Sequence, residues 1–363
     1  MFLIARFPAH TYAVLSRRKT LSMEFPTLDK FPRKVLARID IQRAFILSRL
    51  IVAAERLQIF RALHCKRMKA ASIGRALKIH RYYRDPFLNT LVSLGLLHKA
   101  GDTYWNTRFA KKYFIDERSI YWTRQYSKEC VQAYEALTVL EKALASGRSY
   151  ESIKGLKKPR YTEVMKRDRR VAEDFTQMLF HLHQDDAEAL ARYLDLSKHH
   201  ALLDVCGGSG VMSIALARKN SHLQVCVLDI GAVCRIAAGN IRRAGLSRRI
   251  RTLTGDIRER LPIGYDVLLL CDIGSVSKKL LRNAYESLPA GGLLVAADRY
   301  LSDDGTRPLD RLISHFVGSS FGLATRADMV EAMRTCGFRA VKAANVYRDL
   351  WFITGIKPSG RSE

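Results

Sequence analysis

A glycine-rich segment in the second half of the chain holds the residues best suited to chemistry. Residues 202–210 read Leu-Leu-Asp-Val-Cys-Gly-Gly-Ser-Gly, so Asp204 is followed by Gly207, Gly208 and Gly210. Glycines are expected where a strand turns sharply into a helix, because a Cβ there would keep a ligand away from the backbone. The pattern predicts a ligand-binding turn.

Further acidic residues follow the next two predicted strands. Asp229 ends one apolar run, and Asp256 and Ile257 follow the next one. A carboxylate at the first position can accept two hydrogen bonds from a ribose diol. Asp256 can accept a hydrogen bond from an adenine amino group, and Ile257 can cover the ring. Together these residues predict an adenosine site at the carboxyl ends of parallel strands.

The position of Asp204 favours one adenosine cofactor over another. The dinucleotide fingerprint G-x-G-x-x-G fails because Ser213 stands at the third glycine position. A carboxylate three residues before the glycines would also repel a pyrophosphate, whereas it attracts a sulfonium and an amino group by some tenths of a kcal/mol to roughly a few kcal/mol. We therefore predict S-adenosyl-L-methionine rather than NAD.

Alternating strands and helices must position this site. Apolar strand-like runs are predicted at 201–205, 224–228, 250–253, 267–270, 293–297, 340–344 and 351–356. Helical segments between them are predicted at 211–217, 233–244, 277–288 and 326–336. This alternation predicts an α/β, Rossmann-like domain with a parallel sheet that is covered on both faces.

The first third of the chain predicts a different unit. One long amphipathic helix is expected at 40–63, a second at 70–77 and a third at 85–94, which starts near Pro86 and stops at Gly95. Two short strands around a turn follow, the order of a winged-helix domain. The predicted divisions are a basic extension (1–39), a winged-helix-like domain (40–115), a helical connector (116–172), a Rossmann-like catalytic domain (173–357) and a tail (358–363).

Charge and cysteine content indicate which partners and which cellular compartment suit the chain. The chain has 61 Lys and Arg against 35 Asp and Glu, a net charge of +26, which would attract anionic membrane, nucleic acid or acidic metabolites. Seven cysteines without a CxxC pair favour a reducing compartment, here the cytoplasm. The basic residues 1–22 fit a transit peptide, an extension, or a start assigned before Met23.

Over residues 40–357 the chain resembles the plant-type and bacterial small-molecule O-methyltransferases, which include hydroxyindole O-methyltransferase and bacterial carotenoid and bacteriochlorophyll methyltransferases. The similar segments are 54–60, 91–97, 147–150, 172–178, 204–210, 228–229, 255–256, 288–292 and 336–338. The resemblance implies a winged-helix-like domain that forms a homodimer. It also implies a Rossmann-like domain that binds S-adenosyl-L-methionine and methylates a small aromatic or conjugated molecule, at oxygen.

Three departures from the family pattern stand out. Cys206 replaces the first glycine of the run, which is tolerable only where that residue needs no positive φ. No proline follows Asp229. The family's His-Asp-Trp after the fourth strand, whose histidine deprotonates the acceptor, is missing, since residues 266–281 hold no histidine.

Without this histidine, the sequence does not identify the residue that deprotonates the acceptor. His315 and His181 are the candidate replacements, and Asp272 is expected to approach the cofactor or the acceptor; we include it with the cofactor-binding residues. Alternatives are methylation of carbon, nitrogen or sulfur without a histidine base, and a cofactor-binding homologue that does not methylate. A winged-helix regulator that binds DNA is disfavoured, because the third helix offers mostly apolar side chains.

Overall fold

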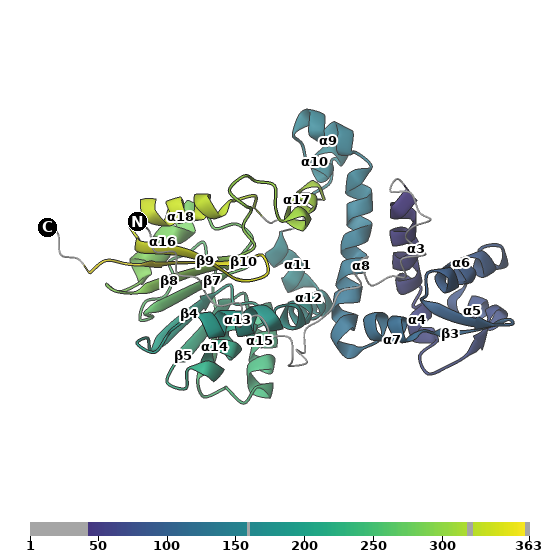
Figure 1. Ribbon diagram of the computed structural model, residues 1–363, viewed down its shortest axis with the longest axis horizontal. Coiled ribbons are helices and arrows are strands. Elements are labelled where there is room, and N and C mark those ends of the chain that lie inside the picture. The colour runs from purple at the N-terminus through teal and green to yellow at the C-terminus, as the bar shows by residue number, and fades with distance from the viewer. Residues whose placement is uncertain (1–42, 158–159, 318–321, 360–363) are drawn as a thin grey trace, which may run out of the picture.

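The computed structural model describes residues 43–157, 160–317 and 322–359. A small N-terminal unit and a larger sheet-containing unit lie at opposite ends of the molecule, and the long helix α8 (Glu117–Leu137) stands between them (Figure 1). The predicted fold class, a Rossmann-like domain preceded by a helical, winged-helix-like domain, is confirmed.

The N-terminal unit packs helices against a three-stranded sheet. Its helices are α3 (Ala44–Arg56), α4 (Ile59–Ala62), α5 (Ala70–Leu77), α6 (Arg81–Ser93) and α7 (Arg108–Phe114). Its strands run in the order β1 (Met68–Lys69), β3 (Thr103–Asn106), β2 (Leu97–Ala100). The hairpin of β2 and β3 was predicted, and β1 was not, because two residues carry no readable alternation.

Two predicted helix boundaries in this unit are wrong. The single helix expected at 40–63 is broken at Gln58, which takes a left-handed φ of 59°. This break turns Ile59 and Phe60 into the core, where both are buried. The third helix begins at Arg81 rather than near Pro86, because His80 provides an N-cap: its Nδ1 accepts a hydrogen bond from the Tyr82 amide at 3.3 Å.

The connector is a series of helices. They are α8, α9 (Leu140–Ser146), α10 (Tyr150–Lys154) and α11 (Tyr161–Arg167), and they are followed by α12 (Arg169–Leu182) and α13 (Gln184–Tyr193). The helical connector predicted at 116–172 is divided where Val139 leaves the helical conformation before α9. Its second, charged part contains α10 and α11.

The larger unit contains a seven-stranded sheet in the order β6-β5-β4-β7-β8-β10-β9. Its parallel strands are β4 (Ala201–Val205), β5 (Gln224–Asp229), β6 (Ile250–Thr254), β7 (Val267–Cys271) and β8 (Leu293–Asp298). The last two strands, β9 (Arg339–Tyr347) and β10 (Leu350–Ile356), pair antiparallel. Every strand predicted in this region is present, which agrees with the strength of its apolar runs.

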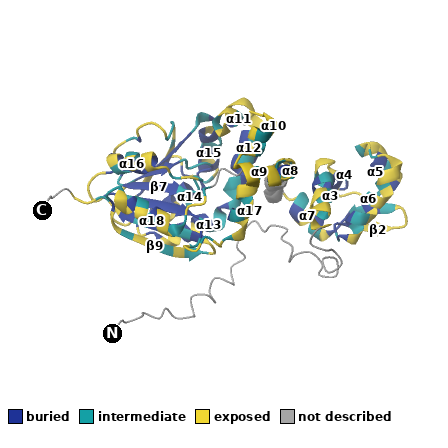
Figure 2. Ribbon diagram, turned by 90° about the horizontal axis from the view of Figure 1, so that it is seen from above, coloured by how far each residue is buried: buried dark blue, intermediate teal, exposed yellow. Residues whose placement is uncertain are grey.

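Helices cover both faces of this sheet. Leu202 and Leu269 pack in a core with α13, α14 (Val211–Lys219) and α15 (Gly231–Arg243). Leu203, Leu268 and Leu270 pack on the other face with α16 (Lys278–Ser287) and α18 (Arg326–Thr335). The central strands are therefore apolar on both sides, and Figure 2 shows them buried between the helical layers.

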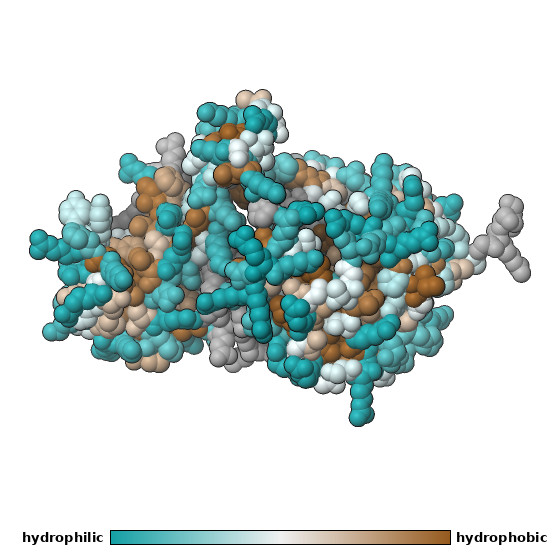
Figure 3. All heavy atoms as spheres, turned by 180° about the vertical axis from the view of Figure 1, so that it is seen from behind, coloured by the Kyte–Doolittle hydropathy of each residue, from teal (hydrophilic) through white to brown (hydrophobic). Residues whose placement is uncertain are grey.

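The outer surface is mostly hydrophilic. Figure 3, seen from behind, shows hydrophilic side chains over much of both units, with hydrophobic residues in scattered patches. Within the described residues, no helix is both long and apolar enough to cross a membrane.

A buried polar bridge connects the helical layer to the glycine turn. Asn240, on α15, donates a hydrogen bond from Nδ2 to the Ser209 carbonyl oxygen at 2.9 Å. Its Oδ1 accepts from Gln177 Nε2 on α12 at 3.0 Å and from Arg243. The turn is thus held in place by side chains of two helices as well as by the strand before it.

We expect Asn240→Ala to lower the free energy of unfolding by about 1–3 kcal/mol, because it leaves a buried carbonyl and a buried amide without partners. Urea unfolding followed by circular dichroism measures the change. Asn283→Ala is the matched control, since Asn283 makes one exposed hydrogen bond to the Glu259 carbonyl at 2.8 Å. Equal effects of the two substitutions would contradict the structural role of Asn240.

Candidate functional site

The glycine turn between β4 and α14 has the geometry that its sequence predicted. Gly208 and Gly210 take left-handed φ values of 54° and 77°. A Cβ on Gly207 would lie 2.6 Å from Cγ of Asp204, closer than real contacts allow. Cys206 also has a positive φ, 55°, so the condition stated for tolerating it is not met. A left-handed residue with a Cβ costs about 1–2 kcal/mol, which places backbone strain inside the turn.

Asp204 lies beneath this turn, buried in the domain. Its Oδ2 accepts a hydrogen bond from the Ser213 hydroxyl at 2.6 Å, while its Oδ1 has no hydrogen-bond partner among the described residues. Burial, assisted by the charge of Asp229, raises the pKa of Asp204 to about 7 against the effect of Ser213. In the sequence, Ser213 stands out only as the residue that breaks the dinucleotide fingerprint, and its bond to Asp204 leaves no signal there.

Asp229 ends β5 and turns back onto the glycine turn. The Gly208 amide donates to its Oδ2 at 3.0 Å, and the Ile230 amide donates to its Oδ1 at 2.7 Å. Burial raises the pKa of Asp229 in spite of these two bonds. The structure thus joins Asp229 directly to the turn, as expected from strand ends that share one edge of a sheet.

Tyr161, on α11, approaches the same edge and was not predicted. The residue keeps 48% of its surface exposed, but its hydroxyl is desolvated, and this desolvation together with the charge of Asp229 raises the pKa of Tyr161. Its ring packs edge to face on Phe175 with centroids 5.9 Å apart. Nothing in the spacing of the connector marks this tyrosine, because only the fold packs α11 against α12 and α15.

Asp256 and Ile257 follow β6, further along the edge. Arg258 Nε donates to Asp256 Oδ1 at 2.9 Å, and this side-chain hydrogen bond is the main reason that the pKa of Asp256 falls to about 2. Ile257 packs against the core of the second face. The carboxylate is ionised and lies at the surface, while the apolar neighbour is partly covered.

On the other side of the turn, Asp272 follows β7 and joins a buried charged group. Its Oδ2 lies 3.2 Å from Nε2 of His183, which stands between α12 and α13. His183 Nδ1 lies 2.8 Å from Asp186 Oδ2, and Arg299 Nη2 donates to that same oxygen at 2.8 Å. We refer to His183, Asp186, Asp272 and Arg299 as the His183 cluster.

The charges of this cluster determine the protonation state of His183. Burial by itself lowers the pKa of His183, but the hydrogen bond to Asp186 and the charges of Asp186 and Asp272 outweigh it and raise the pKa to about 9. A neighbouring pair, Asp298 and Arg311, adds one charge of each sign. His183 is therefore an imidazolium at neutral pH. It was overlooked because a histidine between two helices has no motif around it.

The two predicted catalytic histidines lie elsewhere. His315 is on the exposed side of α17 (Leu309–Phe316), and the nearest described ring contact is Phe316, with centroids 6.0 Å apart. His181 lies on α12 with its ring near Phe180, at a centroid distance of 5.6 Å. For His315, the described interactions include no contact with the His183 cluster or the glycine turn.

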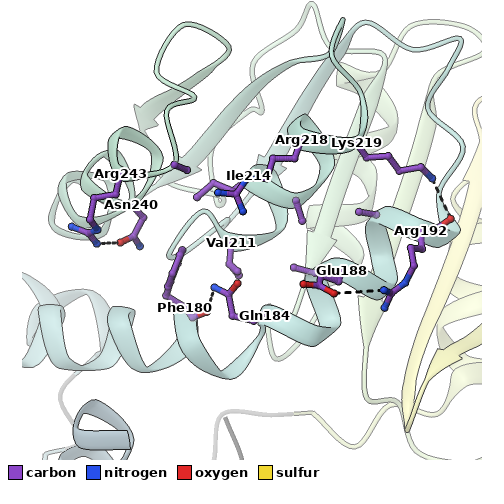
Figure 4. A pocket seen from close by; sticks show the side chains of 14 residues that line it. Phe180, Gln184, Glu188, Arg192, Val211, Ile214, Arg218, Lys219, Asn240 and Arg243 are labelled. Carbon is purple, nitrogen blue, oxygen red and sulfur yellow. Dashed lines mark hydrogen bonds and ion pairs between the residues drawn. The ribbon is translucent and has the colours of Figure 1, made fainter. Parts of the chain in front are cut away.

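A separate hollow of about 510 Å³ lies between α13, α14 and α15, on the outer side of α14 (Figure 4). Its floor is apolar, and its charged rim is largely paired, as in the contact of Glu188 with Arg192 and of Lys219 with the Arg192 carbonyl. None of the predicted site residues lines it. It is distinct from the edge that Asp204, Asp229 and Asp272 form.

Comparison with known families is decisive at this point. Residues 137–327, more than half of the chain, match the O-methyltransferase domain, and residues 39–116 match the O-methyltransferase dimerisation domain. The chain belongs to the O-methyltransferase family.

Individual relatives of this methyltransferase act on different acceptors. The chain is 28% identical over 312 residues to 3-hydroxy-5-methyl-1-naphthoate 3-O-methyltransferase of Streptomyces sahachiroi, and the match covers 84% of this chain and 89% of the relative. It is 26% identical over 334 residues to the N,N-dimethyltransferase OxyT of Streptomyces rimosus, covering 88% and 96%. The solved structure of PigF with SAH superimposes with a TM-score of 0.77 at 20% identity, covering 87% and 97%.

These matches confirm the predicted family, and with it the predicted enzyme class. They do not assign individual residues, so the roles of the site residues in this methyltransferase stay predictions.

The charged state of His183 makes the stability of the methyltransferase depend on pH. Its pKa in the folded chain, about 9, is above the ordinary histidine value of about 6.5. The stabilisation it provides is therefore complete below pH ~6.5 and is lost as the pH rises through about 9. We expect the free energy of unfolding of wild type relative to His183→Gln to fall by up to about 1.4 kcal/mol per pH unit in this window.

Urea unfolding between pH 6 and 9.5 measures this difference. His199→Gln provides a matched control, because the partly exposed His199 lies 3.6 Å from Asp266. A difference between wild type and His183→Gln that stays constant over the range would show that His183 is not charged in the folded chain.

Proposed function

We propose that this chain transfers a methyl group from S-adenosyl-L-methionine to a hydroxyl oxygen of a small aromatic or conjugated metabolite. When bound, S-adenosyl-L-methionine supplies an electrophilic methyl group on a positively charged sulfur. The observation that carries the proposal is the joined arrangement of Asp204, the glycine turn and Asp229 at one edge of the sheet. The predicted cofactor is confirmed at the level of the family.

Each cofactor-binding residue has a proposed role. Gly207, Gly208 and Gly210 give the backbone close approach to the ligand, and Asp229 accepts hydrogen bonds from the ribose. Asp204 faces the positive charge of the ligand, because its buried Oδ1 has no other described hydrogen-bond partner. The proposed cofactor-binding residues are Asp204, Gly207, Gly208, Gly210, Asp229, Asp256, Ile257 and Asp272.

Asp256 and Ile257 are proposed to bind the adenine, since they follow β6, the strand next to β5. For that role the Asp256 carboxylate has to accept a hydrogen bond from the adenine amino group while it keeps its hydrogen bonds from Arg258. The lone pairs of its two oxygens allow both. His315 and His181 stay candidate bases on sequence grounds. Because the relatives include both an O- and an N,N-methyltransferase, methylation of nitrogen is the second candidate function.

The setting of the enzyme is proposed on separate grounds. We propose a homodimer, which the match of residues 39–116 to a dimerisation domain supports. All seven cysteines have free thiols and lie within the described residues, which supports a cytoplasmic location. The net charge of +26 supports contact with an anionic membrane surface, whereas the dimerisation domain offers no argument for nucleic acid.

We expect Asp229→Ala to weaken the binding of S-adenosyl-L-methionine roughly 5- to 150-fold, because the ribose hydroxyls lose a charged acceptor worth about 1–3 kcal/mol. Isothermal titration calorimetry measures the affinity. Asp195→Ala is the control, since Asp195 is an exposed residue bonded to the Ser197 amide. Unchanged affinity of Asp229→Ala would refute the site, and no binding by the wild type would refute the proposed function.

The raised pKa of Asp204, about 7, gives a second test. A positively charged ligand favours the ionised carboxylate, so binding has to compete with the proton below this pKa. We expect wild-type affinity for S-adenosyl-L-methionine to increase about tenfold from pH 6 to pH 8. Calorimetry at both values checks this, and Asp204→Asn should lose the increase. The same increase in Asp204→Asn would assign it to another group.

A further inference from the structure

We propose that Asp272 is the catalytic base of this methyltransferase and that His183, held by Asp186, is its positioning residue. The inference rests on the proposed function, because it assigns a proton acceptor to the same site. It replaces the histidine that the sequence lacks by a carboxylate with an imidazolium behind it.

The order of the strands places Asp272 at the reacting end of the site. With adenine over β6 and ribose at Asp229 on β5, the ligand continues across β4 and its glycine turn toward β7. Neighbouring strands are about 4.8 Å apart, so Asp272 lies roughly 10 Å beyond Asp229, on the side away from the adenine. An S-adenosyl-L-methionine bound in this way would bring its sulfonium end toward Asp272, where an acceptor could approach it.

The local backbone directs Asp272 to this position. Asp272 has a left-handed φ of 50°, and its amide donates to the Ala297 carbonyl of β8 at 2.9 Å. Strained non-glycine residues persist where the surrounding structure fixes them, and they gather at functional sites. Here the strain lies at the end of β7, beside the strained turn that follows β4.

Exposure distinguishes the members of the His183 cluster. The side chain of Asp272 is 22% exposed, whereas those of His183 and Asp186 are 8% and 3% exposed. Arg299 is 29% exposed, but its guanidinium is bound to Asp186. Asp272 is thus the only carboxylate of the His183 cluster that an acceptor can reach.

The contact between Asp272 and His183 places a positive charge beside the carboxylate. Nε2 of His183 lies 3.2 Å from Asp272 Oδ2, close enough to attract it strongly. Asp186 fixes the imidazole from the other side at 2.8 Å, and Arg299 holds Asp186.

The proposed proton transfer breaks one O–H bond and forms another. The O–H bond of the acceptor breaks, its electron pair stays on the acceptor oxygen, and the proton moves to a carboxylate oxygen of Asp272. His183 keeps both of its protons throughout and holds Asp272 in place. After the reaction, the exposed Asp272 returns its proton to solvent. A general base of this kind contributes about 10²–10⁴-fold to the rate.

The test uses the full chain and a series of naphthols whose acidity is raised stepwise by ring nitro groups. We expect Asp272→Asn to lower kcat at pH 7 at least about 100-fold on 1-naphthol, and progressively less on the more acidic naphthols, which are already ionised. Asparagine tolerates the left-handed φ, so the variant keeps the backbone. Its kcat is compared with that of wild type at saturating S-adenosyl-L-methionine, with the affinity measured by calorimetry, so that weaker cofactor binding is separated from slower turnover.

Asp185→Asn is the matched control and should behave as wild type, because Asp185 precedes Asp186 but bonds to the Tyr347 hydroxyl at 3.1 Å. His183→Gln should lower kcat about tenfold, since Asp272 loses the neighbour that holds it in position. In ¹⁵N-histidine NMR, Asp272→Asn should lower the pKa of His183, and Asp185→Asn should not.

Three outcomes would overturn the inference. The first is an equal loss of kcat by Asp272→Asn on every naphthol, which indicates a structural effect. The second is an unchanged kcat. The third is a pKa of His183 that Asp272→Asn leaves unchanged. Failure of the wild type to bind S-adenosyl-L-methionine, or to methylate any naphthol, would instead refute the proposed function, so the two failures can be told apart.

Discussion

Carboxylates at the ends of four neighbouring strands have to leave water, and the cost of that desolvation shapes the whole site. Burial raises the pKa of Asp204, of Asp229 and, to about 6, of Asp298. The chain offsets this cost differently at each strand. Asp204 accepts a hydrogen bond from a hydroxyl, and Asp229 accepts two from backbone amides. Asp298 is paired with a guanidinium, and Asp272 with an imidazolium. One of these carboxylates, Asp204, keeps an oxygen without a described partner, and this is where positive charge is favoured.

The packing of the sheet holds these strand ends in place. Helices pack on both faces of the sheet, so the central strands are apolar throughout and only their ends can be polar. Two residues at these ends, Cys206 and Asp272, hold left-handed backbones that disfavour a Cβ. The surrounding layers stabilise that strain, and the Asn240 bridge shows how a helix on one face reaches the turn.

The two halves of the site differ in how far they follow the family. The half between β6 and β4 has the glycine turn and the acidic strand ends on which the resemblance depends. The half at β7 departs from it, because the histidine is missing after this strand and Asp272 there contacts the buried His183. The relatives differ as well, since one is named as an O-methyltransferase and another as an N,N-dimethyltransferase.

The sequence by itself determined the order of strands and helices, the family, and the residues Asp204 and Asp229, because these depend on local apolar runs and on spacing along one strand and its turn. It misjudged the break at Gln58 and the start of α6, where buried side chains and a histidine cap override the periodic pattern. Only the tertiary structure brought His183, Asp186 and Asp272 together. Their contact joins the α12–α13 junction to the end of β7, some ninety residues apart in sequence, and electrostatic attraction across such a distance leaves no local signature.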